Sequence, residues 1–139
     1  RKVPQPILDA FNENGWTFVI GTEYLTDLSR KLGVNCIGAA SYADKTIYIS
    51  AAGSTLHEFG HFLSSTLNDT AALEELYRLE ARDSCLRAYA KTSAAEYFAD
   101  FFAYWIANGQ NAGKMARLQA SAPQTYAYFE GLEADGWSR

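Results

Sequence analysis

The sequence predicts an α+β domain with a small sheet in its first half and a mostly helical second half. β-branched and aromatic residues are dense over 16–20 and 36–50, as in short strands. After residue 54, apolar residues recur at helical spacing almost to the end of the chain. With 139 residues, 48% of them hydrophobic, the chain is long enough for one core, and a single domain over 1–139 is expected.

The first half is expected to supply the sheet. Ile7, Leu8 and Phe11 share one helical face, and Gly15 ends that helix. The expected elements are a helix over 4–14, a strand over 16–20, a helix from Thr22 or Thr26 to about Gly33, and strands over 36–42 and 46–50 joined by a turn at 43–45. The edge of this hairpin can hold an extended peptide through main-chain hydrogen bonds. A plain core hairpin is the simpler interpretation of its residues.

The second half is expected to be a series of helices. Ser54 is a candidate N-cap for the first of these helices. A later helix over 92–108 is bounded by Ser93 and Gly109, and because it is apolar nearly all round it belongs in the centre of the domain. Two more helices are expected over 113–119 and after 122. The first helix buries a stripe at Leu56, Gly60, Leu63 and Leu67. The helix that begins at Asp69 or Thr70 is expected to turn Leu73, Leu76, Tyr77 and Leu79 inward and Glu74, Glu75, Glu80 and Asp83 to solvent.

Charge and composition narrow the range of partners. The net charge is −4 and there is no basic run, so neither nucleic acid nor an anionic membrane is expected as a partner. No apolar run approaches a membrane span and no signal peptide is recognisable at Arg1. Cys36 and Cys85 are too far apart for a metal knuckle, and buried thiols are favoured over one disulfide. The chain is expected to be a monomer.

The motif H-E-x-x-H at 57–61 carries the chemistry. On a helix, its spacing turns His57 and His61 to one face, where two imidazoles can hold one metal ion. Glu58 lies beside that ion without being needed as a ligand, so it can act as a general base. The alternative is a core helix that carries these residues by chance. It is disfavoured because burying a carboxylate and two imidazoles is costly without a metal or partners.

The third metal ligand follows by elimination. The chain has only two histidines, both in the motif, so a carboxylate is required. Glu96 lies in the apolar helix, whereas Glu74, Glu75 and Glu80 lie in a helix with a solvent face. A cysteine thiolate would weaken the Lewis acidity needed to activate water. Asp100, one turn after Glu96, can orient a ligating histidine by accepting its free ring N–H.

Four segments in the same order resemble a known family. The motif at 57–61, Tyr89, the run 95–102 around Glu96 and the segment 121–126 are similar to the zinc metallopeptidase domain of anthrax lethal factor and its relatives, which include the secreted Pro-Pro endopeptidases of clostridia. The resemblance implies a zincin-like, gluzincin-type fold with one zinc on His57, His61 and Glu96. It further implies Glu58 as general base, Tyr89 as oxyanion stabiliser, a peptide or protein substrate, and secretion from a bacterium.

The hypothesis from the sequence is therefore a zinc-dependent metalloendopeptidase. Two alternatives stay open: a non-catalytic, zinc-stabilised peptide-binding domain and a zinc hydrolase of a non-peptide amide. The stretch between Gly33 and His57 lacks the loop rich in Gly and Trp that the Pro-Pro endopeptidases carry, so a Pro-Pro preference is not inferred.

Overall fold

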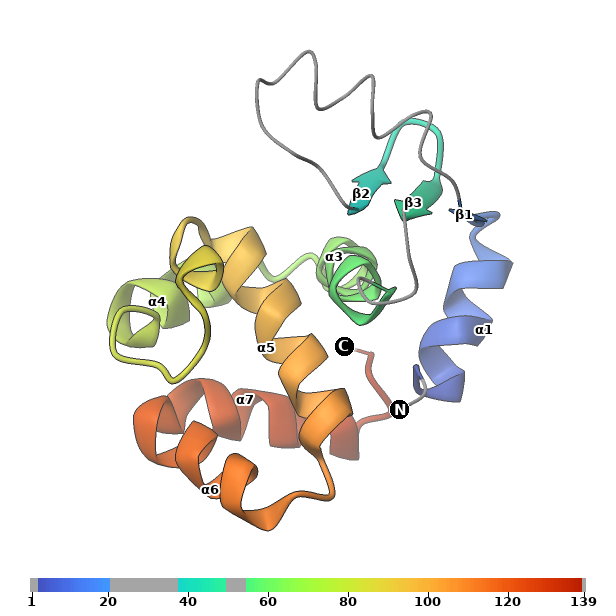
Figure 1. Ribbon diagram of the computed structural model, residues 1–139. Coiled ribbons are helices and arrows are strands. Elements are labelled where there is room, and N and C mark those ends of the chain that lie inside the picture. Colours follow the sequence, from blue (N-terminus) through green and yellow to red (C-terminus); the bar gives the residue numbers. More distant parts are fainter. Residues whose placement is uncertain (1–2, 21–37, 50–54, 139) are drawn as a thin grey trace.

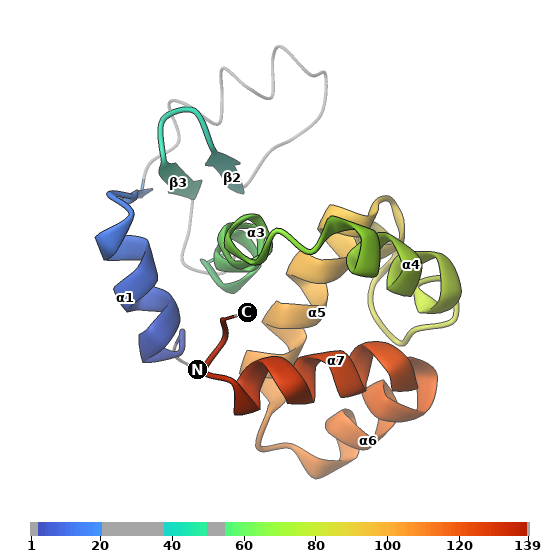
Figure 2. The same cartoon turned by 180° about the vertical axis from the view of Figure 1, so that it is seen from behind.

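The computed structural model describes residues 3–20, 38–49 and 55–138. Helix α3 (Thr55–Leu67) lies at the centre, between the small sheet and helix α5 (Ala94–Asn108) (Figure 1). Helix α1 (Gln5–Glu13) stands beside the sheet, and α6 (Ala112–Ser121) and α7 (Pro123–Ala134) lie beyond α5, as the view from behind also shows (Figure 2). The predicted α+β class with a helical second half is confirmed.

Three short strands form the sheet, in the order β1-β3-β2. Strands β2 (Gly38–Ser41) and β3 (Thr46–Ile49) make the predicted antiparallel hairpin, and Lys45 has a positive φ of 51° in its turn. Strand β1 (Thr17–Ile20) adds to β3 in parallel, with Thr17 opposite Thr46. The helix predicted over 22–33 lies outside the described residues. Ile47 on the central strand is fully buried and joins the sheet to the core.

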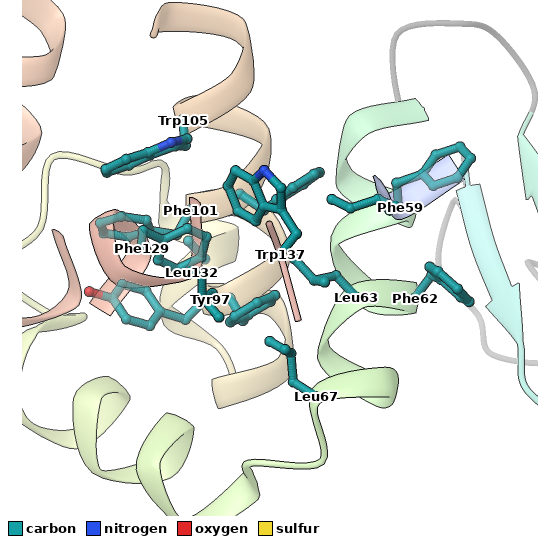
Figure 3. Close-up of a cluster of buried hydrophobic side chains, with 14 of the residues drawn as sticks. Phe59, Phe62, Leu63, Leu67, Tyr97, Phe101, Trp105, Phe129, Leu132 and Trp137 are labelled. Carbon is teal, nitrogen blue, oxygen red and sulfur yellow. The ribbon is translucent and has the colours of Figure 1, made fainter. Parts of the chain in front are cut away.

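Helix α3 is buried on two sides, which explains its high apolar content. Phe59 and Phe62 point toward the sheet side, where the ring of Phe11 from α1 lies 4.8 and 5.2 Å from theirs (Figure 3). Leu63 and Leu67 belong to the same buried cluster as the aromatic residues of α5 and α7. Burial on both sides fixes the orientation of the helix, and with it the face that carries the histidines.

The crossing of α3 and α5 depends on Gly60. A Cβ atom at this position would lie 2.7 Å from the Cα atom and 2.9 Å from the carbonyl oxygen of Ala99, closer than van der Waals contact permits. Glycine therefore allows the two backbones to approach closely. Because Gly60 precedes His61 and Ala99 precedes Asp100, this contact brings the histidine face of α3 against the acidic face of α5.

The remaining helices complete the core. Ser93 caps α5 as predicted, its hydroxyl accepting from the N–H of Glu96 at 3.1 Å. The ring of Phe101 on α5 stacks on Phe129 of α7 at 4.7 Å. Helix α6 begins one residue earlier than predicted, capped by Asn111. None of the described helices is both long and apolar enough to cross a membrane. Cys85 is a half-buried free thiol, and Cys36 lies outside the described residues.

Two expectations for helix α4 (Thr70–Glu80) were wrong. Leu79, predicted to face inward, is 44% exposed. Glu80, predicted to face solvent, is only 7% exposed. Its carboxylate accepts hydrogen bonds from the N–H groups of Gln124 and Thr125, at 2.8 and 2.7 Å, and from the Thr125 hydroxyl at 2.7 Å. These N–H groups belong to the first turn of α7, which has no cap of its own. Glu80 thus serves as its cap from another helix.

Candidate metal centre

Two helices bring three potential ligands together. His57 and His61 lie one turn apart on α3, and Glu96 lies in the first turn of α5. Glu96 Oε1 is 2.9 Å from His57 Nε2 and 3.1 Å from His61 Nε2. One ligand atom from each residue falls within 4.8 Å of the others, so the three residues could hold a single metal ion.

The donor atoms fit zinc in type, and the distances from the Glu96 oxygen to the two imidazole nitrogens are close to those in a zinc site. Two nitrogens and one carboxylate oxygen form a common set for a zinc site with an open position. At bond lengths of about 2.0–2.1 Å, the corners of a tetrahedron around zinc lie about 3.3 Å apart. The separations of 2.9 and 3.1 Å are within a few tenths of an ångström of this value, so a small outward adjustment would accommodate the ion.

Glu58 lies on the same helix and is more deeply buried than the ligands. It is 4% exposed, and its Oε1 atom has no hydrogen-bond partner among the described residues. Burial raises the pKa of Glu58, partly offset by the nearby imidazoles. A buried carboxylate oxygen without a partner is costly, and a water or another polar group beside it would remove that cost.

Asp100 contacts the other ring nitrogen of His57. The distance from Asp100 Oδ1 to His57 Nδ1 is 2.5 Å, and Asp100 is 7% exposed. The Arg87 guanidinium binds the same carboxylate at two points, from Nε to Oδ2 at 2.6 Å and from Nη2 to Oδ1 at 2.9 Å. The predicted placement of Asp100 beside a ligating histidine agrees with this geometry, whereas Arg87 was not predicted.

Negative charge dominates the cluster. Burial of the imidazole opposes protonation of His57, but its hydrogen bonds to Asp100 and Glu96 outweigh that effect and raise its pKa to about 9. Burial likewise opposes ionisation of Glu96, yet the two histidines hold its pKa well below the usual range. Among the described residues, the three carboxylates of Glu58, Glu96 and Asp100 thus favour protonation of His57 even though Arg87 pairs with one of them. A divalent cation could replace that proton and balance the same negative charge.

Two exposed tyrosines lie near the cluster. Tyr89 is in the short 3-10 helix η2 (Ala88–Lys91), 48% exposed, with its ring centroid 5.9 Å from that of His57. Burial and the charge of Glu96 raise the pKa of Tyr89 to about 12. Tyr42, just after β2, is 52% exposed, and its hydroxyl lies 3.5 Å from the carbonyl oxygen of His61. Its pKa is raised by burial and then by the charges of Glu58 and Glu96.

Neither Arg87 nor Tyr42 could be predicted as part of the site from the sequence. A buried Asp100 requires a cationic partner, but Arg78, Arg82 and Arg87 all precede it, and their spacing does not distinguish Arg87 from the other two. Tyr42 was assigned to a strand and carried no distinguishing spacing. The predicted residues, in contrast, all lie in one neighbourhood: His57, Glu58, His61, Tyr89, Glu96 and Asp100.

A separate groove of about 530 Å³ lies at the other end of α5. Its lining includes Trp105, Met115 and Tyr126 together with the carboxylates of Glu130 and Glu133. It contains none of the residues of the metal cluster, so the groove and the cluster are distinct features of the surface.

The fold and the cluster define a class of protein: an α+β domain in which an H-E-x-x-H helix and a glutamate from a second helix form a candidate metal site. A family model described as anthrax toxin lethal factor, N- and C-terminal domain, matches residues 40–132. Because the match covers more than half of the chain, the chain belongs to this family, and the predicted resemblance to lethal factor is confirmed. No curated protein matches the chain significantly.

Proposed function

We propose that this chain is a zinc-dependent metalloendopeptidase with a gluzincin-type active site. His57, His61 and Glu96 would hold one zinc ion, which would supply Lewis-acid activation of water and of the substrate carbonyl. The proposal is supported by the spacing of these three donors, by membership of the lethal factor family, and by the excess of carboxylates around them.

The side chains around the site have distinct tasks in peptide hydrolysis. Glu58 takes the proton from the attacking water and passes it to the leaving amine, a role that suits a carboxylate whose pKa is raised by burial. The Tyr89 hydroxyl, which stays protonated because its pKa is about 12, donates a hydrogen bond to the developing oxyanion. Asp100 accepts from His57 Nδ1 and so leaves Nε2 directed at the metal position.

The single observation that carries the catalytic reading is the unpartnered Oε1 of Glu58. A non-catalytic zinc domain needs only the three ligands, and nothing in its chemistry requires a further buried carboxylate with an unpartnered oxygen beside them. A general base, on the other hand, needs a lone pair that no protein donor occupies, and Oε1 of Glu58 has one among the described residues. Strand β2, which lies at the edge of the sheet among the described strands, offers a place for an extended peptide next to α3.

The test is cleavage of a peptide library followed by mass spectrometry. Zinc-loaded parent protein should cleave peptides. Glu58→Gln should keep its zinc and its fold but lose several orders of magnitude in kcat, because the base and not a ligand has been removed. If the library stays intact while a non-peptide amide is hydrolysed, the substrate class is wrong. If nothing is cleaved by the zinc-loaded parent, the catalytic role is wrong.

The setting of the enzyme belongs to the same proposal. We propose a secreted bacterial enzyme that acts as a monomer on peptide or protein substrates, with no nucleic-acid or membrane partner. The resemblance to lethal factor and the secreted Pro-Pro endopeptidases supports secretion, and the acidic composition supports the absence of polyanionic partners.

A further inference from the structure

Arg87 contacts two parts of the candidate site at once. Its guanidinium makes a two-point contact with the Asp100 carboxylate, at 2.6 and 2.9 Å, and its Cζ atom lies 5.1 Å from the centroid of the Tyr89 ring. The geometry points to Arg87 as a positioning residue that orients His57 through Asp100 and holds the ring of Tyr89 beside the metal site. This inference rests on the proposed function and names a residue to which the motif assigns no role.

The first part of the argument concerns Asp100. This carboxylate is 7% exposed and shared between His57 and Arg87. Two parallel contacts from a planar guanidinium fix the plane of a carboxylate, which a single donor cannot do. With its plane fixed, Oδ1 is aimed at His57 Nδ1, and the imidazole cannot rotate without breaking a buried, charge-assisted contact. The direction of Nε2 therefore depends on Arg87 as well as on Asp100.

The second part concerns Tyr89. Arg87 is the residue directly before η2, and Tyr89 is the second residue of that helix. The guanidinium lies over the ring face, a favourable cation–π arrangement. Nearly half of the Tyr89 residue is exposed, and Arg87 adds to the contacts that its side chain makes with His57 and Glu96. Because one guanidinium touches both the carboxylate and the ring, it couples the position of the phenol to that of the metal ligand.

A lysine could not replace this arginine fully. An ammonium group would restore the charge beside Asp100, but it cannot make the two-point planar contact or stack as a flat cation on the ring. Arg87→Lys therefore separates the effect of geometry from that of charge. Arg82 offers a matched control, because it lies in the same connection between α4 and η2 and pairs with Asp83 only at 3.8 Å, with a side chain 94% exposed.

The experiment measures zinc affinity by competition with a chromogenic chelator, and kcat and KM at saturating zinc. Arg87→Gln should weaken zinc binding about 10–100-fold, the usual cost of losing the partner that orients a ligand. Arg87→Lys should recover part of this loss, and Arg82→Gln should match the parent. At saturating zinc, Arg87→Gln should still lower kcat more than it changes KM, because the tyrosine is displaced in the transition state.

A double-mutant cycle tests the route of the effect. In an Asp100→Asn background, Arg87→Gln should cost little further zinc affinity, because the partner through which it acts is already altered. Full additivity, or Arg87→Gln with the parental zinc affinity and kcat, would overturn the inference. Circular dichroism of each variant checks folding, and Arg87→Lys keeps the comparison available if Arg87→Gln unfolds. A folded parent that binds no zinc would instead overturn the proposed function, which is a separable outcome.

Discussion

Replacing Gly60 by alanine tests the close crossing that assembles the site. The added Cβ would lie 2.7 Å from Ala99 Cα and 2.9 Å from its carbonyl oxygen, whereas ordinary contacts begin at about 3.4 Å. Both contacted atoms are backbone atoms of α5, so no side chain can rotate away. To relieve the closer contact, α3 and α5 must separate locally by about 0.7 Å, the difference between 3.4 and 2.7 Å.

The expected magnitude is the balance of two effects. Alanine in a helix interior is favoured over glycine by about 1 kcal/mol. Overpacking costs about 1–3 kcal/mol, and the upper part of that range applies because the backbone itself must move. We therefore expect Gly60→Ala to lower the free energy of unfolding of the metal-free protein by about 1–2 kcal/mol. Zinc affinity should fall as well, since ligand distances tolerate shifts of only about 0.2 Å.

The assay is urea unfolding of chelator-treated protein, together with chelator competition for zinc affinity. Gly113→Ala is the matched control: it also lies in a helix, and its added Cβ would meet only Asn111 Oδ1 at 3.6 Å, an ordinary contact. This control should leave zinc affinity unchanged and keep or raise stability by up to about 1 kcal/mol. A Gly60→Ala variant that behaves like this control would refute the reasoning.

Three further predictions follow from the site and the core. Protein purified without added metal should hold close to one zinc per chain by elemental analysis. Removing the zinc with a chelator should lower the Tm, because the ion binds only the native state. Well-folded protein free of any metal would contradict this prediction. Tyr89→Phe should lower kcat by about 10²–10³ at nearly constant KM with zinc retained; an unchanged kcat would leave the tyrosine a packing role only. Glu80→Ala should destabilise the fold by about 2–3 kcal/mol, because it leaves buried N–H donors of α7 without an acceptor. The control Glu74→Ala, at an exposed position, should change stability by no more than about 0.5 kcal/mol, and equal effects of the two substitutions in urea unfolding would refute the capping role.

Local signals in the sequence predicted most of the helices and the hairpin. The N-cap at Ser93 and the helix-ending glycine at Gly15 act within a few residues of the chain. Hydrophobic periodicity and intrinsic secondary-structure propensity likewise act within a single helix or strand. The cluster could also be predicted in large part, because the count of histidines forces a carboxylate ligand and a carboxylate in an apolar helix stands out. That ground and the resemblance to lethal factor both indicate Glu96, which lies within hydrogen-bond distance of both histidines.

Contacts between distant segments could not be predicted in the same way. Glu80 falls on the polar side of its helix by periodicity, but its partners at 124–125 reach it only after the chain has turned back through α5 and α6. The pairing of Arg87 with Asp100 depends on the path of the connection after α4, which no spacing rule encodes. In both cases a charged residue that looks solvated from the sequence has a buried partner, and only the three-dimensional path reveals it.

The distribution of burial divides the candidate site into a rigid part and an accessible part. His57, Glu58 and Asp100 lie on two core helices and are at most 9% exposed, so their positions are set by the same packing that stabilises the domain. Tyr42 and Tyr89 lie outside those helices and are 52% and 48% exposed. Substitutions at these tyrosines should therefore change the accessible surface of the site more than the packing of the proposed metal ligands, whereas substitutions at the α3–α5 crossing should disturb that packing directly. In such an arrangement, substrate specificity can change through the exposed segments that carry the tyrosines while the geometry of the proposed metal ligands is kept. The exposed segments and the buried helices depend on different contacts.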